Sequence, residues 1–251
     1  MTSILKANAI CKKFGALLVT DSVSLDIKKG ELHAIIGPNG AGKTTLINQL
    51  SGELKSDSGS ITFADKDISS LSIDARARHG LLRSYQITSV FDELSVQENA
   101  CLAALGSKKN GFQFWHRLLD DKASVQSAND AIASTGLEPR AHVKASDLGY
   151  GERRQLELAM ALAAQPQFLL LDEPMAGMSV QESFAVVELL QKLKSQYTIL
   201  LVEHDMNAVF ALADRISVLV YGRIIFTGTP EEVKNNAEVR AVYLGDEEIS
   251  V

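Results

Sequence analysis

Three things are scarce in this sequence, and each shortage narrows what the protein can be. Only two cysteines are present, Cys11 and Cys101, without the spacing of a metal site, so we expect buried apolar side chains in a reducing compartment. Lys and Arg number 25 against 31 Asp and Glu, a formal net charge of −6, which argues against a dedicated nucleic-acid binder. No apolar run approaches the roughly 20 residues of a membrane-spanning helix.

The amino terminus shows a further absence. MTSILKANAI has neither the long apolar segment nor the small-residue cleavage site of a signal peptide, so we expect a cytoplasmic protein. Any role at a membrane would then need a partner. The composition is otherwise that of a globular chain, with 46% hydrophobic and 22% charged residues over 251 positions.

Short apolar runs alternate with helical patterns along much of the chain. LHAII (32–36), FLLLD (168–172) and TILLVE (198–203) are typical of strands covered on both faces. Strands interleaved with helices predict a largely parallel sheet with helices on both sides. Residues 92–145 are helix-like and interrupt this alternation, as an inserted segment would.

Other stretches predict antiparallel structure near the two ends of the chain. ILKANAI and VSLDI read as strands, and SITFADKDI as a hairpin with its turn near Asp65 and Lys66. ISVLVYG and RIIFTG predict a second hairpin, with Gly222 and Arg223 at the turn.

GPNGAGKTT, residues 37–45, fits the phosphate-binding pattern G-x-x-x-x-G-K-[ST] between a predicted strand and a predicted helix. Its glycines let backbone N–H groups wrap phosphates without a Cβ clash. We expect Lys43 to reach the β- and γ-phosphates and Thr44 to place its hydroxyl on Mg²⁺. The predicted nucleotide-binding residues of this loop are Gly37, Pro38, Asn39, Gly40, Ala41, Gly42, Lys43, Thr44 and Thr45.

Two predicted strands end in residues that suit phosphate chemistry. FLLLDEP brings Asp172 to a strand end, where it would hold Mg²⁺ through water, and Glu173 follows as a residue that could orient an attacking water. TILLVEHD ends another strand at His204, which we expect to contact the γ-phosphate because open α/β sheets bind ligands at these strand ends.

A second anion site is predicted at DLGYGERRQ (147–155), where a Gly-Tyr-Gly turn leads into a helix. Free N–H groups point outward at such a start. The alternative is an ordinary helix start with a glycine-rich approach.

Together these motifs resemble the ATP-binding subunit of an ABC transporter. GPNGAGKTT is similar to the Walker A motif, FLLLDEP to Walker B with its following glutamate, LGYGE (148–152) to the signature LSGGQ, and EHD (203–205) to the H-loop. Gln86 resembles the Q-loop glutamine, and Phe14 stands where the family places an aromatic that stacks on adenine. The resemblance covers essentially the whole chain in the right order.

The resemblance implies an α/β fold, a P-loop NTPase core of the ABC ATPase type with an antiparallel β subdomain and an inserted helical subdomain. A single ABC ATPase domain would span 1–251. The catalytic core with the β subdomain would occupy 1–86 and 155–251, and the helical signature subdomain 87–154.

The resemblance also implies a mechanism that uses ATP and Mg²⁺. Two subunits would form a head-to-tail sandwich, in which the signature of one contacts the phosphate bound to the P-loop of the other. The residues acting in trans would be Gly149, Tyr150, Gly151 and Glu152. The catalytic residues would be Glu173, His204, Lys43 and Gln86, and the metal ligands Thr44, Gln86 and Asp172.

Two departures from the family pattern weaken parts of this expectation. Gly149 stands at the signature serine, so one hydrogen bond to a charged phosphate is lost, about 1.5–3 kcal/mol. Backbone N–H groups and the helix dipole remain, which predicts a weakened rather than an inactive site. Ser179 stands at the aspartate of the D-loop, which puts coupling across the dimer through that loop in doubt.

Longer stretches resemble one branch of the family, the importers of branched-chain amino acids, amides and urea; these are YGERRQLELAMALA, DEPMAGMSVQES, LLVEHDMNAVFALADRISVL and AVYLG. That branch implies a second ATPase subunit, identical or homologous, at the cytoplasmic face of the inner (plasma) membrane. Permease subunits would dock in a groove at 86–94 with Val90 and Phe91 as apolar anchors, and a solute-binding protein would act indirectly. For Phe112, Phe114 and Trp115, in the 106–122 insertion, a small helical core is favoured over a permease contact.

Two other functions stay open on the sequence. One is a soluble ABC ATPase acting on ribosomes or DNA, which the single P-loop and the absence of sustained heptads disfavour. The other is a nucleotide-dependent scaffold with little turnover, which Lys43, Asp172, Glu173 and His204 disfavour. We expect no nucleic-acid partner.

Overall fold

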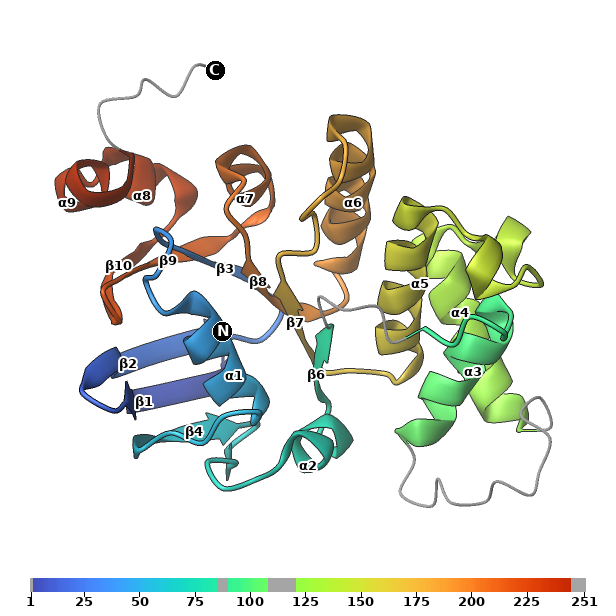
Figure 1. Cartoon of the computed structure of the whole chain (residues 1–251), viewed down its shortest axis with the longest axis horizontal. Coiled ribbons are helices and arrows are strands. Elements are labelled where there is room, and N and C mark those ends of the chain that lie inside the picture. Colours follow the sequence, from blue (N-terminus) through green and yellow to red (C-terminus); the bar gives the residue numbers. More distant parts are fainter. Residues whose placement is uncertain (1, 85–89, 108–120, 245–251) are drawn as a thin grey trace.

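The computed structural model describes residues 2–84, 90–107 and 121–244, and its two β-sheets are constructed differently (Figure 1). The first sheet is antiparallel with the strand order β2-β1-β4-β5. In the second, of order β10-β9-β3-β8-β7-β6, all neighbours are parallel except the edge pair β9 and β10. The strands are β1 (Ser3–Phe14), β2 (Leu17–Lys28), β3 (Leu32–Ile36), β4 (Ser58–Phe63), β5 (Lys66–Asp67), β6 (Leu81–Ser84), β7 (Phe168–Asp172), β8 (Thr198–Val202), β9 (Arg215–Val220) and β10 (Arg223–Gly228).

The helices connect the strands of both sheets and cover the six-stranded one. They are α1 (Lys43–Ser51), α2 (Ile73–Arg78), α3 (Val96–Gly106), α4 (Lys122–Thr135), α5 (Tyr150–Ala163), α6 (Val180–Leu193), α7 (Met206–Leu212), α8 (Pro230–Asn235) and α9 (Ala237–Val239). Figure 1 shows α1 between the two sheets, α6 to α9 along the other side of the six-stranded sheet, and α3 to α5 as a separate group beside it. Among the described residues, no helix is long and apolar enough to cross a membrane.

The apolar runs form central strands because both of their faces are buried. In β7, Leu169 and Leu171 pack in the apolar cluster shared with α3 to α7, whereas Phe168 and Leu170 pack in the cluster shared with α1 and the antiparallel sheet. Successive side chains of a strand point to opposite faces, so a strand covered on both faces is apolar at most of its positions. The expectation of an α/β fold with an antiparallel subdomain is confirmed.

The helical group is held by small side chains and by capped helix ends. Ala100, Ala104, Ala128 and Ala131 are buried between the helices, which lets their backbones approach closely. Ser95 begins α3 with a capping box, in which its hydroxyl accepts from Glu98 N–H while the Glu98 carboxylate accepts from Ser95 N–H. Helix α5 belongs to this group and runs to Ala163, so the boundary predicted between 154 and 155 falls inside one helix.

The two predicted hairpin turns lie at or within one residue of their expected positions. The 58–67 hairpin turns at Ala64 and Asp65, both of positive φ, close to its predicted position. The last hairpin turns at Tyr221 and Gly222, and Arg223 already begins β10, so the predicted turn was one residue too late. Gln86, Phe112, Phe114 and Trp115 lie outside the described residues.

Candidate nucleotide-binding site

The loop between β3 and α1 is shaped by the elements packed against it. A Cβ on Gly37 would lie 2.1 Å from the carbonyl oxygen of Leu219, and one on Gly42 would lie 2.7 Å from that of Val19. Gly42 also has φ 103°, in the left-handed region that favours glycine. These glycines let the loop press against β9 and β2, while Asn39, Gly40 and Thr44 stay exposed at the start of α1.

Lys43 is buried beneath this loop and is already engaged. Its ammonium donates to the carbonyl oxygens of Gly37 (2.6 Å) and Pro38 (3.1 Å), which uses two of its three donors. Burial lowers the pKa of Lys43, although the carboxylates of Glu173 and Asp172 oppose that shift. Glu173 and Asp172, which are predicted to act on water and on Mg²⁺, therefore lie close enough to Lys43 to affect its pKa.

The two acidic residues after FLLL differ in their surroundings. Asp172 ends β7, largely buried, and its Oδ2 accepts from Arg83 Nη2 at 2.8 Å. Burial raises the pKa of Asp172, and the Arg83 guanidinium only partly offsets this. Glu173 is less buried and has φ 47°, a conformation that residues with a side chain rarely adopt, held by its N–H bond to Val202 O at 2.8 Å.

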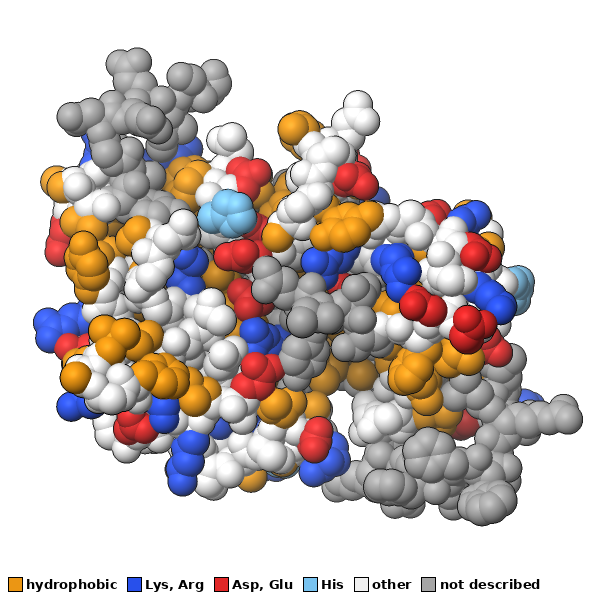
Figure 2. All heavy atoms as spheres, viewed as in Figure 1, with side chains coloured by type: hydrophobic (Ala, Val, Ile, Leu, Met, Phe, Trp, Pro, Cys, Tyr) orange, Lys and Arg blue, Asp and Glu red, His pale blue; other side chains and the backbone are white. Residues whose placement is uncertain are grey.

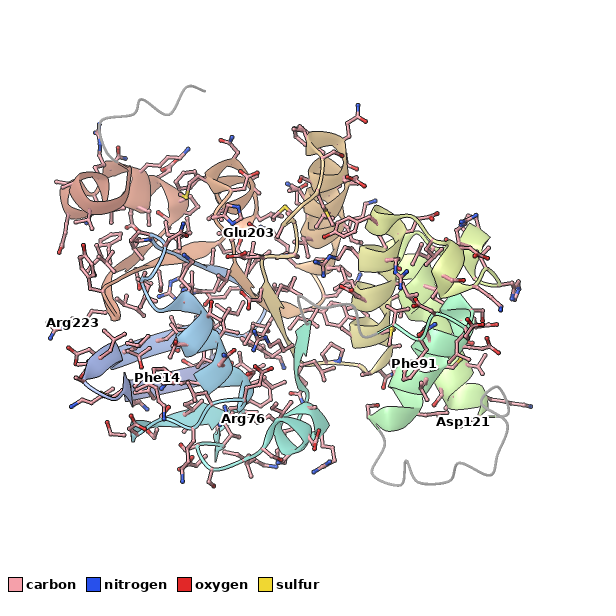
Figure 3. The ribbon with its side chains drawn as sticks, viewed as in Figure 1. Phe14, Arg76, Phe91, Asp121, Glu203 and Arg223 are labelled. Carbon is pink, nitrogen blue, oxygen red and sulfur yellow. The ribbon has the colours of Figure 1, made fainter. Side chains whose placement is uncertain are left out.

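His204 lies beside Glu173 because β7 and β8 are paired parallel strands, whose ends meet at the same edge of the sheet. Its Nδ1 is 3.9 Å from Glu173 Oε1 and 3.7 Å from Glu203 Oε2, and the ring is largely exposed. Glu203 is buried and accepts from the N–H groups of Met175 (2.9 Å) and His204 (3.0 Å), so it ties the segments after β7 and β8 together (Figure 3). Sequence reasoning missed Glu203, and its only signal was a charged residue ending a buried strand.

The donors around Lys43 fit a magnesium ion bound with phosphate better than a resident metal centre. The described residues contain no group of three or more His, Cys, Asp or Glu side chains that could hold a metal. The exposed Thr44 hydroxyl and the Asp172 carboxylate are hard oxygen donors, and Mg²⁺ is usually held by one or two protein groups together with waters and substrate phosphates. The third predicted ligand, Gln86, lies outside the described residues.

The signature segment forms the first turn of α5. Gly149 precedes the helix with ordinary backbone angles (φ −66°, ψ 166°), and its N–H donates to Glu152 Oε2 at 3.0 Å. Glu152 is also paired with Arg140 at 3.1 Å. The Tyr150 hydroxyl donates to Ala176 O at 3.0 Å, so the signature contacts the D-loop of its own chain.

The signature and the P-loop are held apart within one chain. Helix α1 packs in the apolar cluster on one face of the six-stranded sheet, and α5 packs in the cluster on the other. Figure 1 likewise shows α1 and α5 on different sides of β7.

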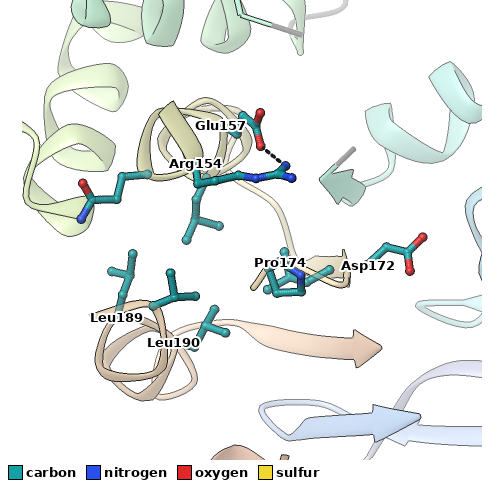
Figure 4. Close-up of a pocket in the computed structure, with 10 residues that line it drawn as sticks. Arg154, Glu157, Asp172, Pro174, Leu189 and Leu190 are labelled. Atoms are coloured by element: carbon teal, nitrogen blue, oxygen red, sulfur yellow. Dashed lines mark hydrogen bonds and ion pairs between the residues drawn. The ribbon is translucent and has the colours of Figure 1, made fainter. Parts of the chain in front are cut away.

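A small cavity of about 30 Å³ lies between α5, β7 and α6. The Arg154–Glu157 ion pair borders it, and the Asp172 carboxylate points away from it (Figure 4).

Phe14, predicted to stack on adenine, and Phe91, predicted to anchor a permease helix, are both exposed. Phe14, at the end of β1, is 50% exposed, with the Lys12 ammonium 5.8 Å from its ring centroid. Phe91 is 54% exposed, whereas Val90 is partly buried against the apolar cluster of the helical group. Figure 2 shows apolar side chains gathered on this face of the molecule over the antiparallel sheet, at the end that carries Phe14 (Figure 3).

Comparison with known families decides what this arrangement is. The sequence model of the ABC transporter family matches residues 20–176, more than half of the chain. The chain belongs to the ABC transporter family. A second model, of the branched-chain amino acid ATP-binding cassette transporter, matches residues 223–249 of this family member.

Relatives and solved structures agree with this membership. LivG of Salmonella typhimurium, a high-affinity branched-chain amino acid transport ATP-binding protein, is 38% identical over 97% of this chain and 98% of its own. LptB of Escherichia coli K12, a lipopolysaccharide export system ATP-binding protein, is 34% identical over the same shares. The ADP conformation of MJ1267, an ATP-binding cassette of an ABC transporter, has a TM-score of 0.87 at 29% identity, covering 98% of this chain and 100% of its own.

The predicted family, fold and enzyme class are thereby confirmed. The chain is an ATP-binding and ATP-hydrolysing component of an ABC transporter. The roles assigned to individual residues remain predictions, as does the Mg²⁺ dependence.

Proposed function

We propose that this ABC ATPase powers the import of branched-chain amino acids or a related small polar solute. The observation that carries the proposal is the match of residues 223–249 to the branched-chain amino acid model, since LivG and LptB are similar to this chain to a comparable degree over nearly its whole length. BraF of Pseudomonas aeruginosa, another high-affinity branched-chain amino acid transport ATP-binding protein, is 33% identical over 97% of this chain.

Within the chain, the residues around Lys43 bind ATP and prepare it for hydrolysis. The 37–45 loop and the Lys43 ammonium, released from the Gly37 and Pro38 carbonyls, hold the β- and γ-phosphates. Thr44, Asp172 and Gln86 would hold Mg²⁺, which neutralises charge on the phosphate oxygens. Glu173 orients the attacking water and accepts its proton on the carboxylate, and His204 contacts the γ-phosphate.

The signature completes the ATP site of a second ATPase subunit. Because α5 and α1 pack on opposite faces of the sheet, the first turn of α5 reaches a phosphate only when another chain supplies it. Gly149, Tyr150, Gly151 and Glu152 form the helix start that faces that phosphate, and the N–H groups of Tyr150, Gly151 and Glu152 are its donors, because the Gly149 N–H donates to Glu152 Oε2. The Glu152 carboxylate repels phosphate, and we assign it the role of holding this turn through Gly149 and Arg140.

Transmission to the membrane occurs at the helical group. We assign 1–86 and 155–251 to the core and 87–154 to the signature subdomain, although α5 itself joins the two. A permease helix docks on the 86–94 segment, where the exposed Phe91 ring serves as apolar anchor and Phe14 is left for adenine. The protein then lies at the cytoplasmic face of the inner membrane through its permease partners, which in turn receive solute from a binding protein.

Uptake in cells tests this function directly. Cells lacking the chain are expected to lose high-affinity uptake of labelled leucine, and the parent chain restores it, whereas Lys43→Ala does not. Uptake unchanged by the loss of the chain, together with a defect in lipopolysaccharide export, would instead favour the role named for LptB.

Assembly can be tested separately by mass in solution. Glu173→Gln with Mg-ATP is expected to shift from monomer to dimer, because bound ATP is no longer cleaved. A monomer at saturating ATP would show that the glycine signature is too weak for a homodimer and needs a non-identical subunit.

A further inference from the structure

Arg83, on the edge strand β6, joins three polar side chains from elements far apart in the sequence. Its Nη1 lies 2.6 Å from Asn48 Oδ1 and 2.8 Å from Glu53 Oε2, and its Nη2 lies 2.8 Å from Asp172 Oδ2. We call these four residues the Arg83 cluster. The Arg83 side chain is only 8% exposed and that of Asp172 only 9%, so the contact is largely shielded from water.

The Arg83 cluster connects the two elements that supply the proposed magnesium ligands. Asn48 lies four residues after Thr44 on α1, so both side chains occupy the same side of the helix, one turn apart. Asp172 ends β7. One guanidinium therefore fixes the distance between the helix that carries Thr44 and the strand that carries Asp172.

The geometry also decides which oxygen of Asp172 remains available. Arg83 engages Oδ2, and in the described part of the chain Oδ1 accepts no hydrogen bond. Carboxylates that bind metals are commonly oriented by hydrogen bonds to their other oxygen. Because Asn48 and Glu53 also hold the guanidinium, Arg83 can keep Oδ2 while Oδ1 accepts a hydrogen bond from a metal-bound water.

We propose that Arg83 is a positioning residue for magnesium, holding Asp172 and α1 in the spacing at which Thr44 and Asp172 Oδ1 serve one ion. This inference rests on the proposed function, because it assumes that Mg²⁺-nucleotide binds at the 37–45 loop. The opposite possibility is that Arg83 is a substitute cation that Mg²⁺ must displace from Asp172. The two predict changes of opposite sign when Arg83 is weakened.

The test measures ADP affinity by calorimetry in EDTA and over a range of Mg²⁺ concentrations. Arg83→Lys keeps a cation beside Asp172 and Glu53 but lacks the planar fork that bridges three partners. We expect the Mg²⁺ concentration for half-maximal enhancement of ADP binding to rise about 10-fold or more, with ADP affinity in EDTA unchanged. Maximal ATPase activity returns at high Mg²⁺.

Two further variants separate positioning from a general loss of structure. Asn48→Ala removes the α1 end of the cluster while leaving the Arg83–Asp172 pair, and is expected to raise the Mg²⁺ requirement less than Arg83→Lys does. Glu188→Gln, an exposed change on α6 outside the Arg83 cluster, is the control and leaves the requirement unchanged. Thermal melting without nucleotide checks that each variant is folded.

A lowered or unchanged Mg²⁺ requirement in Arg83→Lys and Asn48→Ala would overturn the proposal, and a lowered one would identify a displaced cation. These outcomes differ from a failure of the proposed function itself. In that case the parent chain would bind ADP neither in EDTA nor with Mg²⁺.

Discussion

The two halves of the proposed ATP site are built in different ways. The P-loop half rests on β3, β7 and β8, strands in which every residue is buried, and its acidic side chains are held by Arg83 and by strand-end hydrogen bonds. The signature half is the exposed first turn of a helix. It is held by the Tyr150–Ala176 hydrogen bond and by the half-exposed Glu152–Arg140 pair.

This difference predicts two kinds of response to substitution. In a close-packed core the geometry of catalytic groups is over-determined, so changes there remove chemistry or destabilise the fold. At an exposed helix start each hydrogen bond contributes about 1 kcal/mol, so changes there tune affinity. Four substitutions, at Glu173, Phe168, Gly149 and Tyr150, test that contrast with effects of decreasing size.

Glu173→Gln should abolish most turnover while preserving ATP binding. Removal of a group that activates water lowers the rate by about 10²- to 10⁴-fold. Phosphate release measures turnover, and ATP affinity is measured on the same sample. Glu188→Gln, an exposed change on α6, is the control and should match the parent. Parental phosphate release by Glu173→Gln would remove Glu173 from its assigned role.

Phe168→Ala should destabilise the fold by about 3–5 kcal/mol, because it empties a fully buried position. Phe168 packs edge-on against Phe63, with ring centroids 6.1 Å apart, where the two sheets meet. Urea unfolding measures the change. The comparison partner is Phe91→Ala, whose exposed ring should cost well under 1 kcal/mol. Equal losses in the two variants would contradict the contrast between buried and exposed regions.

Gly149→Ser should strengthen ATP-dependent dimerisation by about 10-fold, because it adds a hydroxyl that can reach the partner's phosphate. The nearest atom to a Cβ at this position is Glu152 Oε2 at 3.9 Å, so the side chain fits without displacement. Sedimentation in the Glu173→Gln background measures the dimer. Gly149→Ala supplies the Cβ without the hydroxyl and is the control. If Gly149→Ser and Gly149→Ala strengthened dimerisation equally, the gain would come from the restricted backbone and not from the hydroxyl.

Tyr150→Phe should have the smallest effect, a loss of about 1 kcal/mol in unfolding free energy, because it removes two exposed hydrogen bonds of the hydroxyl, one donated to Ala176 O and one accepted from Arg154. Hydrogen exchange near 176–179 should become faster, since the signature no longer holds the D-loop from within the chain. Exchange unchanged from the parent would show that the D-loop segment is held by Glu203 and the α6 cap alone.

Much of the fold follows from local pattern. The runs at 32–36, 168–172 and 198–203 become central strands because continuous apolar side chains suit burial on both faces. The P-loop was equally readable, since its glycines and lysine lie within nine consecutive positions. The turn of the last hairpin was predicted one residue too late. It begins at Tyr221, whose positive φ of 47° is unusual for a residue with a bulky side chain.

Residues whose role depends on distant partners could not be inferred in this way. Arg83 contacts Asp172, which is 89 positions away, and Glu203 contacts Met175, which is 28 positions away. Neither belongs to a motif of fixed spacing. The engagement of Glu152 by Gly149 and Arg140 was missed although these partners lie only 3 and 12 positions away, because the resemblance assigned Glu152 to a phosphate of another subunit.

The family, the α/β architecture and the candidates for phosphate chemistry could all be inferred from the order of residues, because periodicity and motif spacing are local properties of the chain. How those candidates are held follows from tertiary contacts: which oxygen of Asp172 is engaged, that Glu173 lies beside His204, and that α1 and α5 pack on opposite faces of the sheet. The physical reason is that hydrogen bonds and ion pairs act over a few ångströms in space, and folding alone brings distant positions that close together.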